Sequence, residues 1–259
     1  MSAWTLRRSE RLDAAQLQGQ LHESPARAAQ AVLAMAAASA VEAQALLGQI
    51  LLDGQGIEQD RALALRWFTI AAGKGHLMAI NMLGRCHEHG WGCAPDLTQA
   101  ARYYRQCAER GLDWGLYNLG NLLATGRGVE QNEAAAVACY QRAAALGHAK
   151  SMNLYGRYLE EGRGIPQDIP AAHAWYKRSA EAGDFRGQFS HGGVLVAAGL
   201  VEQGLVWLEK ARLGGHSGFR QVAATLLAQS PVPQLRALSL EFVESSNAGY
   251  DGQTNAVTA

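Results

Sequence analysis

The stretch that decides the fold is residues 43–75, AQALLGQILLDGQGIEQDRALALRWFTIAAGKG, because residues 79–111, AINMLGRCHEHGWGCAPDLTQAARYYRQCAERG, repeat its pattern. Both stretches carry a glycine at the sixth position, a Gly-x-Gly soon after it, and two aromatic residues followed by small residues. The first glycine recurs every 36 residues, at Gly48, Gly84, Gly120, Gly156 and Gly192. A fixed period of this length is typical of stacked repeats, so we predict an all-α solenoid.

Each unit is predicted to contain two helices joined by a tight turn. Residues 42–53 would form the first helix of unit one, because Leu47 and Leu51 recur at the 3.6-residue period of a buried stripe. Gly48 weakens this helix by roughly 1 kcal/mol, so we expect it to allow a close approach between the two helix backbones. In the second helix the bulky Phe68 would fill the gap that small residues leave in its neighbour.

Glycine also marks the connection between the two helices. Gly54 and Gly56 suit a turn that needs positive φ, and Asp60 is placed to cap the second helix by accepting its free N–H groups. The same pattern returns in the next three units, with capping residues Asp96, Asn132 and Asp168. We therefore predict that all four Gly-x-Gly turns are structural.

The ends of the array depart from the pattern, as capping units do. We predict N-terminal helices with a half-repeat cap over 1–40, four full repeats over 41–184, a fifth, shortened repeat over 185–216, capping helices over 217–246 and a disordered tail over 247–259. Pro231 and Pro233 would break the last segment into a helical hairpin, since proline cannot continue a helix.

Composition and charge exclude several classes of function. Twenty-three basic side chains balance twenty-three acidic ones, so no positive field favours nucleic acid or an anionic membrane surface. The longest apolar tract, residues 28–47, contains Gln30, Glu42 and Gln44, which argues against membrane insertion. Neither a secretory apolar segment nor a paired-cysteine framework is present, so we expect a cytoplasmic protein.

The pattern Ala-x3-Leu-Gly-x5-Gly-x-Gly-x3-Asp, followed by Trp/Tyr-Tyr and Ala-Ala-x2-Gly, resembles the Sel1-like repeat, a relative of the tetratricopeptide repeat. The resemblance covers four units from Ala43 to Asp184. It implies a right-handed α-α superhelix of about five to six hairpins with degenerate caps, which works as an adaptor or scaffold for other proteins without a cofactor. Secreted members with a disulfide in each repeat differ from this chain, which offers only Cys86 and Cys93 as a candidate pair.

One cluster could carry metal or redox chemistry. Cys86, His87, His89 and Cys93 are residue types that bind zinc or iron. His87 and His89 diverge on a helix, however, and His87 takes a position that is leucine in other repeats, which favours a half-buried core residue. No Ser-x-x-Lys, Gly-x-Ser-x-Gly or His-Glu-x-x-His occurs, so we expect no enzyme activity.

The better functional signal is what varies between equivalent positions of the first helices. Positions 42, 45, 49 and 52 share an outer face by their spacing, and their equivalents would form a partner-binding groove once the repeats stack. This groove comprises Asn81, Arg85, Glu88, Trp114, Tyr117, Asn121, Lys150, Asn153, Arg157 and Glu160. Aromatic and arginine side chains among amides are the chemistry of protein-binding hot spots.

Two hypotheses of different classes follow. The first is a non-enzymatic adaptor that binds a segment of another protein along this groove. The alternative is a metal-binding or redox accessory protein that uses the Cys86, His87, His89 and Cys93 cluster. A third, a structural spacer or self-assembling subunit, is disfavoured by the terminal caps.

Overall fold

The computed structural model describes residues 24–248, and no strand occurs within this range. The helices are α2 (Pro25–Ala37), α3 (Val41–Asp53), α4 (Arg61–Gly73), α5 (Leu77–His89), α6 (Leu97–Glu109), α7 (Asp113–Thr125), α8 (Glu133–Ala145), α9 (Ala149–Glu161), α10 (Ile169–Glu181), α11 (Phe185–Ala197), α12 (Val201–Gly214), α13 (Ser217–Ala228) and α14 (Pro233–Ala248). The all-α prediction is confirmed. The helices expected before residue 24 lie outside the described residues. The disordered tail was expected over 247–259, but residues 247 and 248 belong to α14, and the rest lies outside the described residues.

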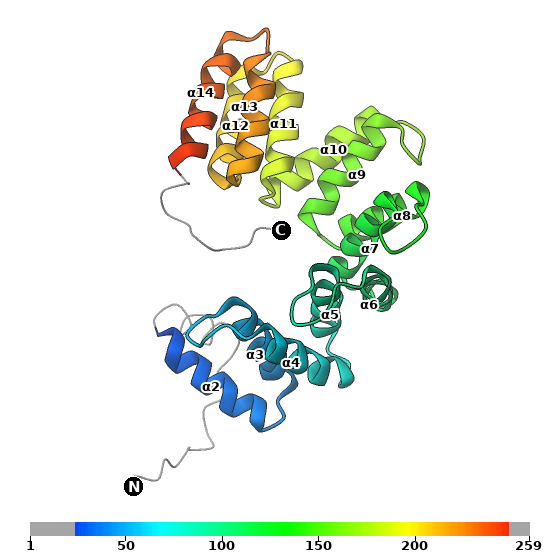
Figure 1. Cartoon of the computed structure of the whole chain (residues 1–259). Coiled ribbons are helices and arrows are strands. Elements are labelled where there is room, and N and C mark those ends of the chain that lie inside the picture. Colours follow the sequence, from blue (N-terminus) through cyan, green and yellow to red (C-terminus); the bar gives the residue numbers. More distant parts are fainter. Residues whose placement is uncertain (1–23, 249–259) are drawn as a thin grey trace. The chain divides into compact units, whose positions relative to one another are not determined.

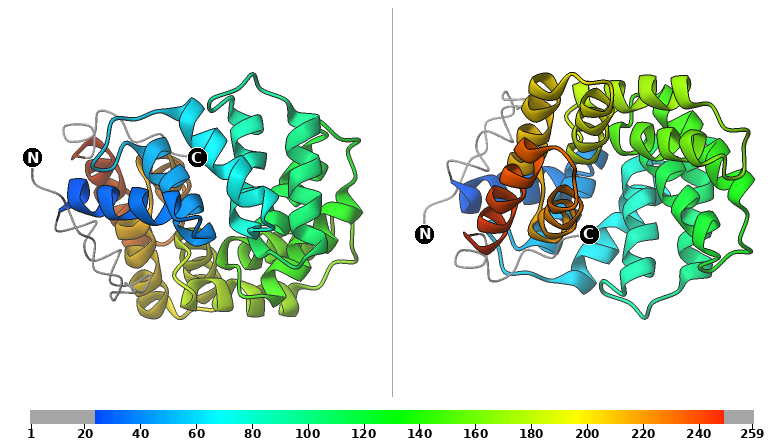
Figure 2. Two further views of the ribbon diagram at one scale, coloured as in Figure 1. Left: turned by 90° about the horizontal axis from the view of Figure 1, so that it is seen from below. Right: turned by 90° about the horizontal axis from the view of Figure 1, so that it is seen from above.

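The chain divides into two compact units, one ending at Gln131 and one beginning at Asn132. In the first unit, α2 packs against α3, and each helix from α3 to α7 packs against the next (Figure 1). In the second unit, α8 to α12 pack in succession, and α13 lies beside α14 (Figure 2). Successive hairpins therefore nest within each unit, as the repeat pattern predicts.

The turns are built by left-handed glycines, as predicted. Gly54 has a φ of 72° and Gly56 a φ of 70°, a region that other residues enter with strain. In the second repeat, Gly92 also lies against the preceding repeat, since a Cβ added there would stand 2.2 Å from the carbonyl oxygen of Arg61. The second glycine of this turn is thus required both by its own φ and by contact with the neighbouring repeat.

Side-chain caps begin the second helices. The Oδ1 atom of Asp60 accepts a hydrogen bond from the backbone N–H of Leu63 at 2.8 Å. The equivalent residues Asp96, Asn132 and Asp168 accept in the same way from the third residue of their own helices. Each bond satisfies an N–H group that has no partner within the helix, so the capping prediction is confirmed.

The repeated helix glycine makes room for an aromatic ring. A Cβ added at Gly48 would lie 2.6 Å from the ring of Phe68, and one at Gly84 would lie 2.4 Å from the ring of Tyr104. We expected the two helix backbones to approach each other at these glycines, and in repeat four they do, since a Cβ added at Gly156 would lie 3.2 Å from the carbonyl oxygen of Ala172. The neighbour that the glycine admits is the ring of the second helix, which explains why glycine and a bulky ring occur together in these repeats.

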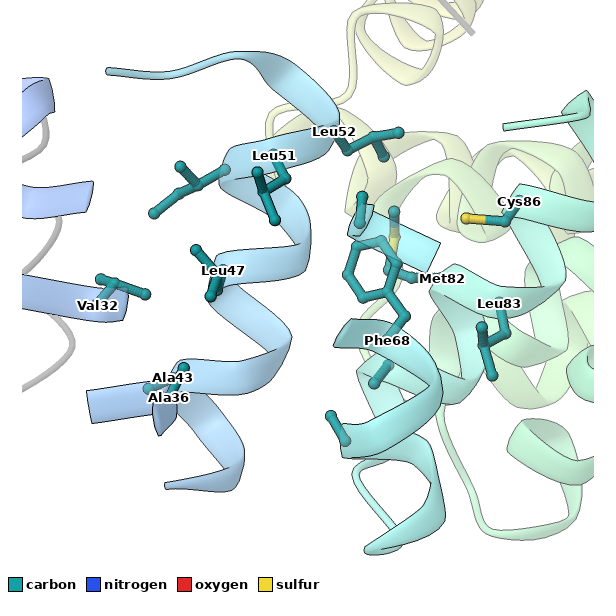
Figure 3. Close-up of a cluster of buried hydrophobic side chains, with 14 of the residues drawn as sticks. Val32, Ala36, Ala43, Leu47, Leu51, Leu52, Phe68, Met82, Leu83 and Cys86 are labelled. Atoms are coloured by element: carbon teal, nitrogen blue, oxygen red, sulfur yellow. The ribbon is translucent and has the colours of Figure 1, made fainter. Parts of the chain in front are cut away.

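The core of the first unit is continuous across repeats. Val32 of α2 and Leu47 of α3 lie in one buried cluster with Phe68 of α4 and Leu83 of α5 (Figure 3). Each repeat thus covers an apolar face of the next, and α2 covers the first face of the array. The sequence predicts a half-repeat cap at this end, and we propose that α2 has this role.

The C-terminal hairpin has its own core. Leu208 of α12 is buried with Leu227 of α13 and with Leu238 and Phe242 of α14. The loop before α14 contains Pro231, and α14 begins at Pro233, a position where the missing proline N–H is tolerated. The break predicted at these prolines is confirmed.

Candidate partner-binding surface

Two of the predicted groove residues are buried between neighbouring first helices. Asn81 on α5 is 2% exposed, and its Oδ1 accepts a hydrogen bond of 3.0 Å from the Nδ2 of Asn118 on α7. Asn153 on α9 is 3% exposed, and its Oδ1 accepts a bond of 3.0 Å from the hydroxyl of Ser190 on α11. The expectation that both asparagines face outward was wrong, because this side of each helix faces the first helix of the next repeat.

Two further groove residues hold a tyrosine of the second helix. Glu88 accepts a hydrogen bond of 2.8 Å from the hydroxyl of Tyr104 and pairs with Arg127 at 3.2 Å. Glu160 accepts a bond of 2.6 Å from the hydroxyl of Tyr176. Burial, together with the neighbouring carboxylate, raises the pKa of Tyr104 far above its usual range, so its hydroxyl keeps the proton that it donates. Both carboxylates therefore stabilise the repeat itself.

The remaining groove residues of the first unit are partly exposed aromatic, basic and amide side chains. Trp114 is 37% exposed, and its ring meets that of Tyr117 edge to face, with ring centres 6.1 Å apart. The guanidinium of Arg85 lies 4.9 Å from the centre of the Trp91 ring, a cation–π contact that orients it. Asn121 is half-buried one turn beyond Tyr117. We call Arg85, Trp91, Trp114, Tyr117 and Asn121 the α5–α7 surface.

The second unit contributes two basic residues from α9. Lys150 is half-buried, and Arg157 is exposed and pairs with Glu161 at 3.3 Å. An exposed pair of this kind one helical turn apart is worth only a few tenths of a kcal/mol, so the arginine can exchange its partner at little cost.

The comparisons with known proteins agree with this architecture. The Sel1 repeat family matches residues 41–76, 77–112, 115–148 and 149–184, which together make up more than half of the chain. The chain belongs to the Sel1 repeat family. A comparison with curated proteins gave no match.

Solved structures show the same fold. A Sel1 repeat protein from Oxalobacter formigenes is 22% identical with a TM-score of 0.76, and the alignment covers 92% of this chain and 100% of that one. The protective antigen c5321 of uropathogenic Escherichia coli is 23% identical with a TM-score of 0.64, covering 92% of this chain and 55% of the other. The immunity protein PA5088 from Pseudomonas aeruginosa is 14% identical with a TM-score of 0.55, covering 82% and 83%.

In this Sel1 repeat protein only part of the candidate metal cluster comes together, and the Sγ of Cys93 lies 3.6 Å from the carbonyl oxygen of Cys86. Cys93 lies 3.7 Å from the Nδ1 of His87, whose ring stacks on Tyr103, whereas His89 packs against Trp91. Within residues 24–248 no three histidine, cysteine or acidic side chains gather as a metal ion requires. The half-buried position expected for His87 is confirmed.

The thiols of this repeat are also poorly suited to metal or redox chemistry. Cys86 is fully buried, and burial raises its pKa to about 12. Burial also raises the pKa of Cys93. Because the thiolate is the reactive form, a raised pKa makes both thiols less reactive than an exposed cysteine.

Three histidines act as helix caps. The Nδ1 atoms of His76, His148 and His216 each accept the backbone N–H of the residue three positions on, at 3.1 to 3.2 Å. This geometry requires a neutral imidazole with its Nδ1 unprotonated. His76, which lies near the cysteine cluster in sequence, is therefore explained by the start of α5.

The sequence analysis named the groove residues but did not identify the side chains that form hydrogen bonds with them. Asn118 and Ser190 lie 37 positions after Asn81 and Asn153, which is one repeat plus one residue. The tyrosine and glutamate pairs lie 16 residues apart in both cases. Repeat one, which has Phe68 in place of tyrosine, has Leu52 in place of the glutamate. Repeat three keeps Tyr140 but has Ala124 at the glutamate position, so the sequence offered only a partial signal for these pairs.

Among the described helices, none has both the length and the apolar character that would let it cross a membrane.

Proposed function

We propose that this protein is a non-enzymatic adaptor that binds a segment of a partner protein on its α5–α7 surface. Sel1 repeats are typically protein-interaction modules, and the observation that carries the assignment to this surface is the partly exposed Trp114 and Tyr117 pair. Tryptophan, tyrosine and arginine are the residues most enriched at protein-binding hot spots. A peptide segment crossing these rings would place its own carbonyl or carboxylate groups within reach of Arg85.

Rigidity supports the same proposal. The hydrogen bond between Asn81 and Asn118 holds α5 against α7, and the cation–π contact with Trp91 orients Arg85. A surface whose side chains are already ordered loses less conformational entropy when a partner binds. In the second unit, Lys150 and Arg157 of α9 are proposed to make polar contacts of their own with a partner protein.

The test is affinity capture from native cells followed by mass spectrometry, comparing the unaltered protein with single variants. Trp114→Ala should reduce recovery of the specific partner most, because loss of a hot-spot anchor costs about 2 kcal/mol, or roughly thirtyfold in affinity. Tyr117→Ala and Arg85→Ala should follow, and Arg157→Ala should have a smaller effect.

The control is Ile70→Ala on α4, which also removes a side chain that is exposed. It should leave recovery unchanged, and circular dichroism should show that all variants are folded. Unchanged recovery with Trp114→Ala and Tyr117→Ala would show that the partner binds elsewhere. We also propose a cytoplasmic location, where thiols such as Cys86 remain reduced.

A further inference from the structure

Exposed apolar side chains are concentrated at the C-terminal end. Within residues 24–248, fifteen large hydrophobic residues are exposed, and seven of them fall between positions 200 and 243, which is less than a fifth of that range. These seven are Leu200, Val206, Leu213, Val222, Leu226, Leu240 and Val243. Of these seven, Leu240 and Val243 line one groove together, and an apolar patch on the surface is a candidate interaction site.

The most exposed part of this surface on α14 is a stripe along its outer side. Leu240 is 65% exposed and Val243 lies one turn further on, whereas Leu238 and Phe242 face the core. Leu240 and Val243 also line a groove of about 610 Å³ between α13 and α14. Within its unit, α14 packs against α13 and, over a smaller area, against α12, and α13 and α14 lie side by side in the right view of Figure 2.

Two charges beside this stripe are placed symmetrically about Leu240, whereas the third charge of α14, Glu241, lies 3.9 Å from Arg212 of α12. Arg236 lies four residues before Leu240 and Glu244 four residues after it, and both are exposed. Residues four apart share a helix face, so all three side chains lie on one strip of α14. When such a helix meets its own copy in the antiparallel direction with Leu240 at the centre, each Arg236 lies opposite the Glu244 of the copy.

We propose that the α13–α14 face pairs with the same face of a second copy of this chain, with the two α14 helices antiparallel about a twofold axis at Leu240. Leu240 and Val243 then pack against their copies, and two Arg236–Glu244 pairs close the interface. A surface that is complementary to itself under a twofold rotation is what an isologous dimer requires. The terminal caps predicted from the sequence argued against a self-assembling subunit. The α13–α14 face now supports self-assembly at the C-terminal end of the array.

The side-chain contacts of Arg236 are compatible with this role. Its Nη1 donates to the carbonyl oxygens of Ser230 and Pro231 at 2.8 and 3.0 Å. A guanidinium carries five N–H donors, so the remaining nitrogens can donate to a carboxylate of the copy. The loop contacts also hold the side chain in place before the copies meet.

The size of the face predicts a weak dimer. A helix of sixteen residues is about 24 Å long, and two packed helices are about 20 Å wide, which gives a face of roughly 500 Å² per copy. This is below the roughly 800 Å² per partner of a standard stable interface. We therefore expect self-association in the micromolar range, with a monomer at nanomolar concentration.

The first experiment is sedimentation velocity of the full chain from about 1 to 200 μM. The unaltered protein should shift from monomer to dimer, whereas Leu240→Glu should remain a monomer throughout. Ile70→Glu, which also places a charge on an exposed isoleucine but in the other unit, should dimerise normally. A monomer at 200 μM for the unaltered protein, or a dimer that survives Leu240→Glu, would overturn the proposal.

The second experiment tests the symmetry directly. Arg236→Glu alone and Glu244→Arg alone each set like charges opposite each other, so each should weaken self-association at least tenfold. A mixture of the two variants should form heterodimers, because every pair across the interface is then of opposite charge. Association that is equally weak in the mixture would contradict the antiparallel arrangement, and thermal melts exclude unfolding of Arg236→Glu.

The same experiments separate a second copy from a different partner protein. If the face binds another protein, the unaltered chain remains monomeric and the charge-reversal mixture shows no gain, so the proposal fails. Failure here leaves the α5–α7 surface unaffected, because none of the variants at α14 alters a residue of that surface.

Discussion

Repeats one and two each place an aromatic ring against the equivalent helix glycine. The two rings differ at the edge farthest from that glycine. In repeat one the ring is Phe68, and Leu52 takes the position that is equivalent to Glu88 of repeat two. In repeat two the ring is Tyr104, and its hydroxyl donates to Glu88. The comparison shows that a residue at a variable position of the first helix can be explained by the second helix of its own repeat.

The largest expected loss of stability comes from filling the space beside the helix glycine, which each of these two repeats contains. Gly84→Ala would bring a methyl group to 2.4 Å from the Tyr104 ring, and inserting a methyl group into a packed core costs about 1–3 kcal/mol. Gly48→Ala, at 2.6 Å from the Phe68 ring, should cost about the same. Urea unfolding measures both.

The control for this prediction is Gly73→Ala at the end of α4. Nothing lies within 4 Å of the added methyl group there, so alanine should be neutral or stabilising by up to about 1 kcal/mol. Equal midpoints for Gly84→Ala and Gly73→Ala would show that the ring does not need the glycine.

Converting repeat two into repeat one is the next prediction. Glu88→Leu leaves the buried Tyr104 hydroxyl without its acceptor, which costs about 1–3 kcal/mol. Adding Tyr104→Phe removes the hydroxyl as well and reproduces the pair of repeat one. The double variant should therefore be more stable than Glu88→Leu alone, with a coupling energy of about 1 kcal/mol in the double-mutant cycle.

Repeat four provides the matched cycle, because Tyr176 donates to Glu160 at 2.6 Å. Glu160 is exposed, so water can replace part of the lost bond, and the coupling should be smaller than in repeat two. Additive effects in repeat two would mean that the hydrogen bond contributes nothing to stability.

These repeats also show which features sequence reasoning reaches. Gly54, Gly56 and Asp60 were predicted correctly because positive φ and helix capping are local requirements that a few consecutive residues satisfy. The helices and their order followed from the same local rules. The fifth repeat, which was predicted to be shortened, has its turn at Gly199 with a φ of 81°.

The surface was harder to predict because it depends on how helices of different repeats meet. The helical period puts Asn81 and Arg85 on one side of α5, but it cannot show that Asn118 of another helix covers only the first of them. For Trp114 the helical period predicts the exposure correctly, since no neighbouring helix covers its position fully. Residue type alone therefore identified the chemistry of the surface but not its extent.

The link between first helices gives a third, smaller prediction. Asn118→Ala removes the donor to the buried Asn81 and should destabilise the first unit by about 1 kcal/mol, a typical value for one hydrogen bond. Ser190→Ala does the same to Asn153 in the second unit. Hydrogen exchange should show faster opening of α5 and α7 in the first variant and of α9 and α11 in the second. A variant whose exchange rises evenly over both units would argue against a local link.

Repeat five offers the last contrast, because it places a histidine where repeat one places a buried leucine. His191 occupies the position of Leu47, is 9% exposed, and packs edge to face on Trp207 at 5.5 Å. Burial is the main cause that lowers the pKa of the His191 imidazole, and the charge of Lys177 on α10 acts in the same direction. His173 adds to this effect and Glu181 opposes it.

The pH dependence follows from the direction of this shift. Since the pKa of His191 is lower in the folded than in the unfolded state, the unfolded chain binds the proton first as the pH falls through about 6.5, and stability decreases from there until the folded pKa is passed. His191→Leu should remove this loss, whereas Leu47→His should create one in the first unit. Thermal melts between pH 7.5 and 5 measure both, and an unchanged acid response in His191→Leu would assign the loss to other groups. The two substitutions exchange the residues of equivalent positions. If the acid-induced loss of stability decreases in His191→Leu and appears in Leu47→His, the buried environment of this position makes a histidine there sensitive to acid.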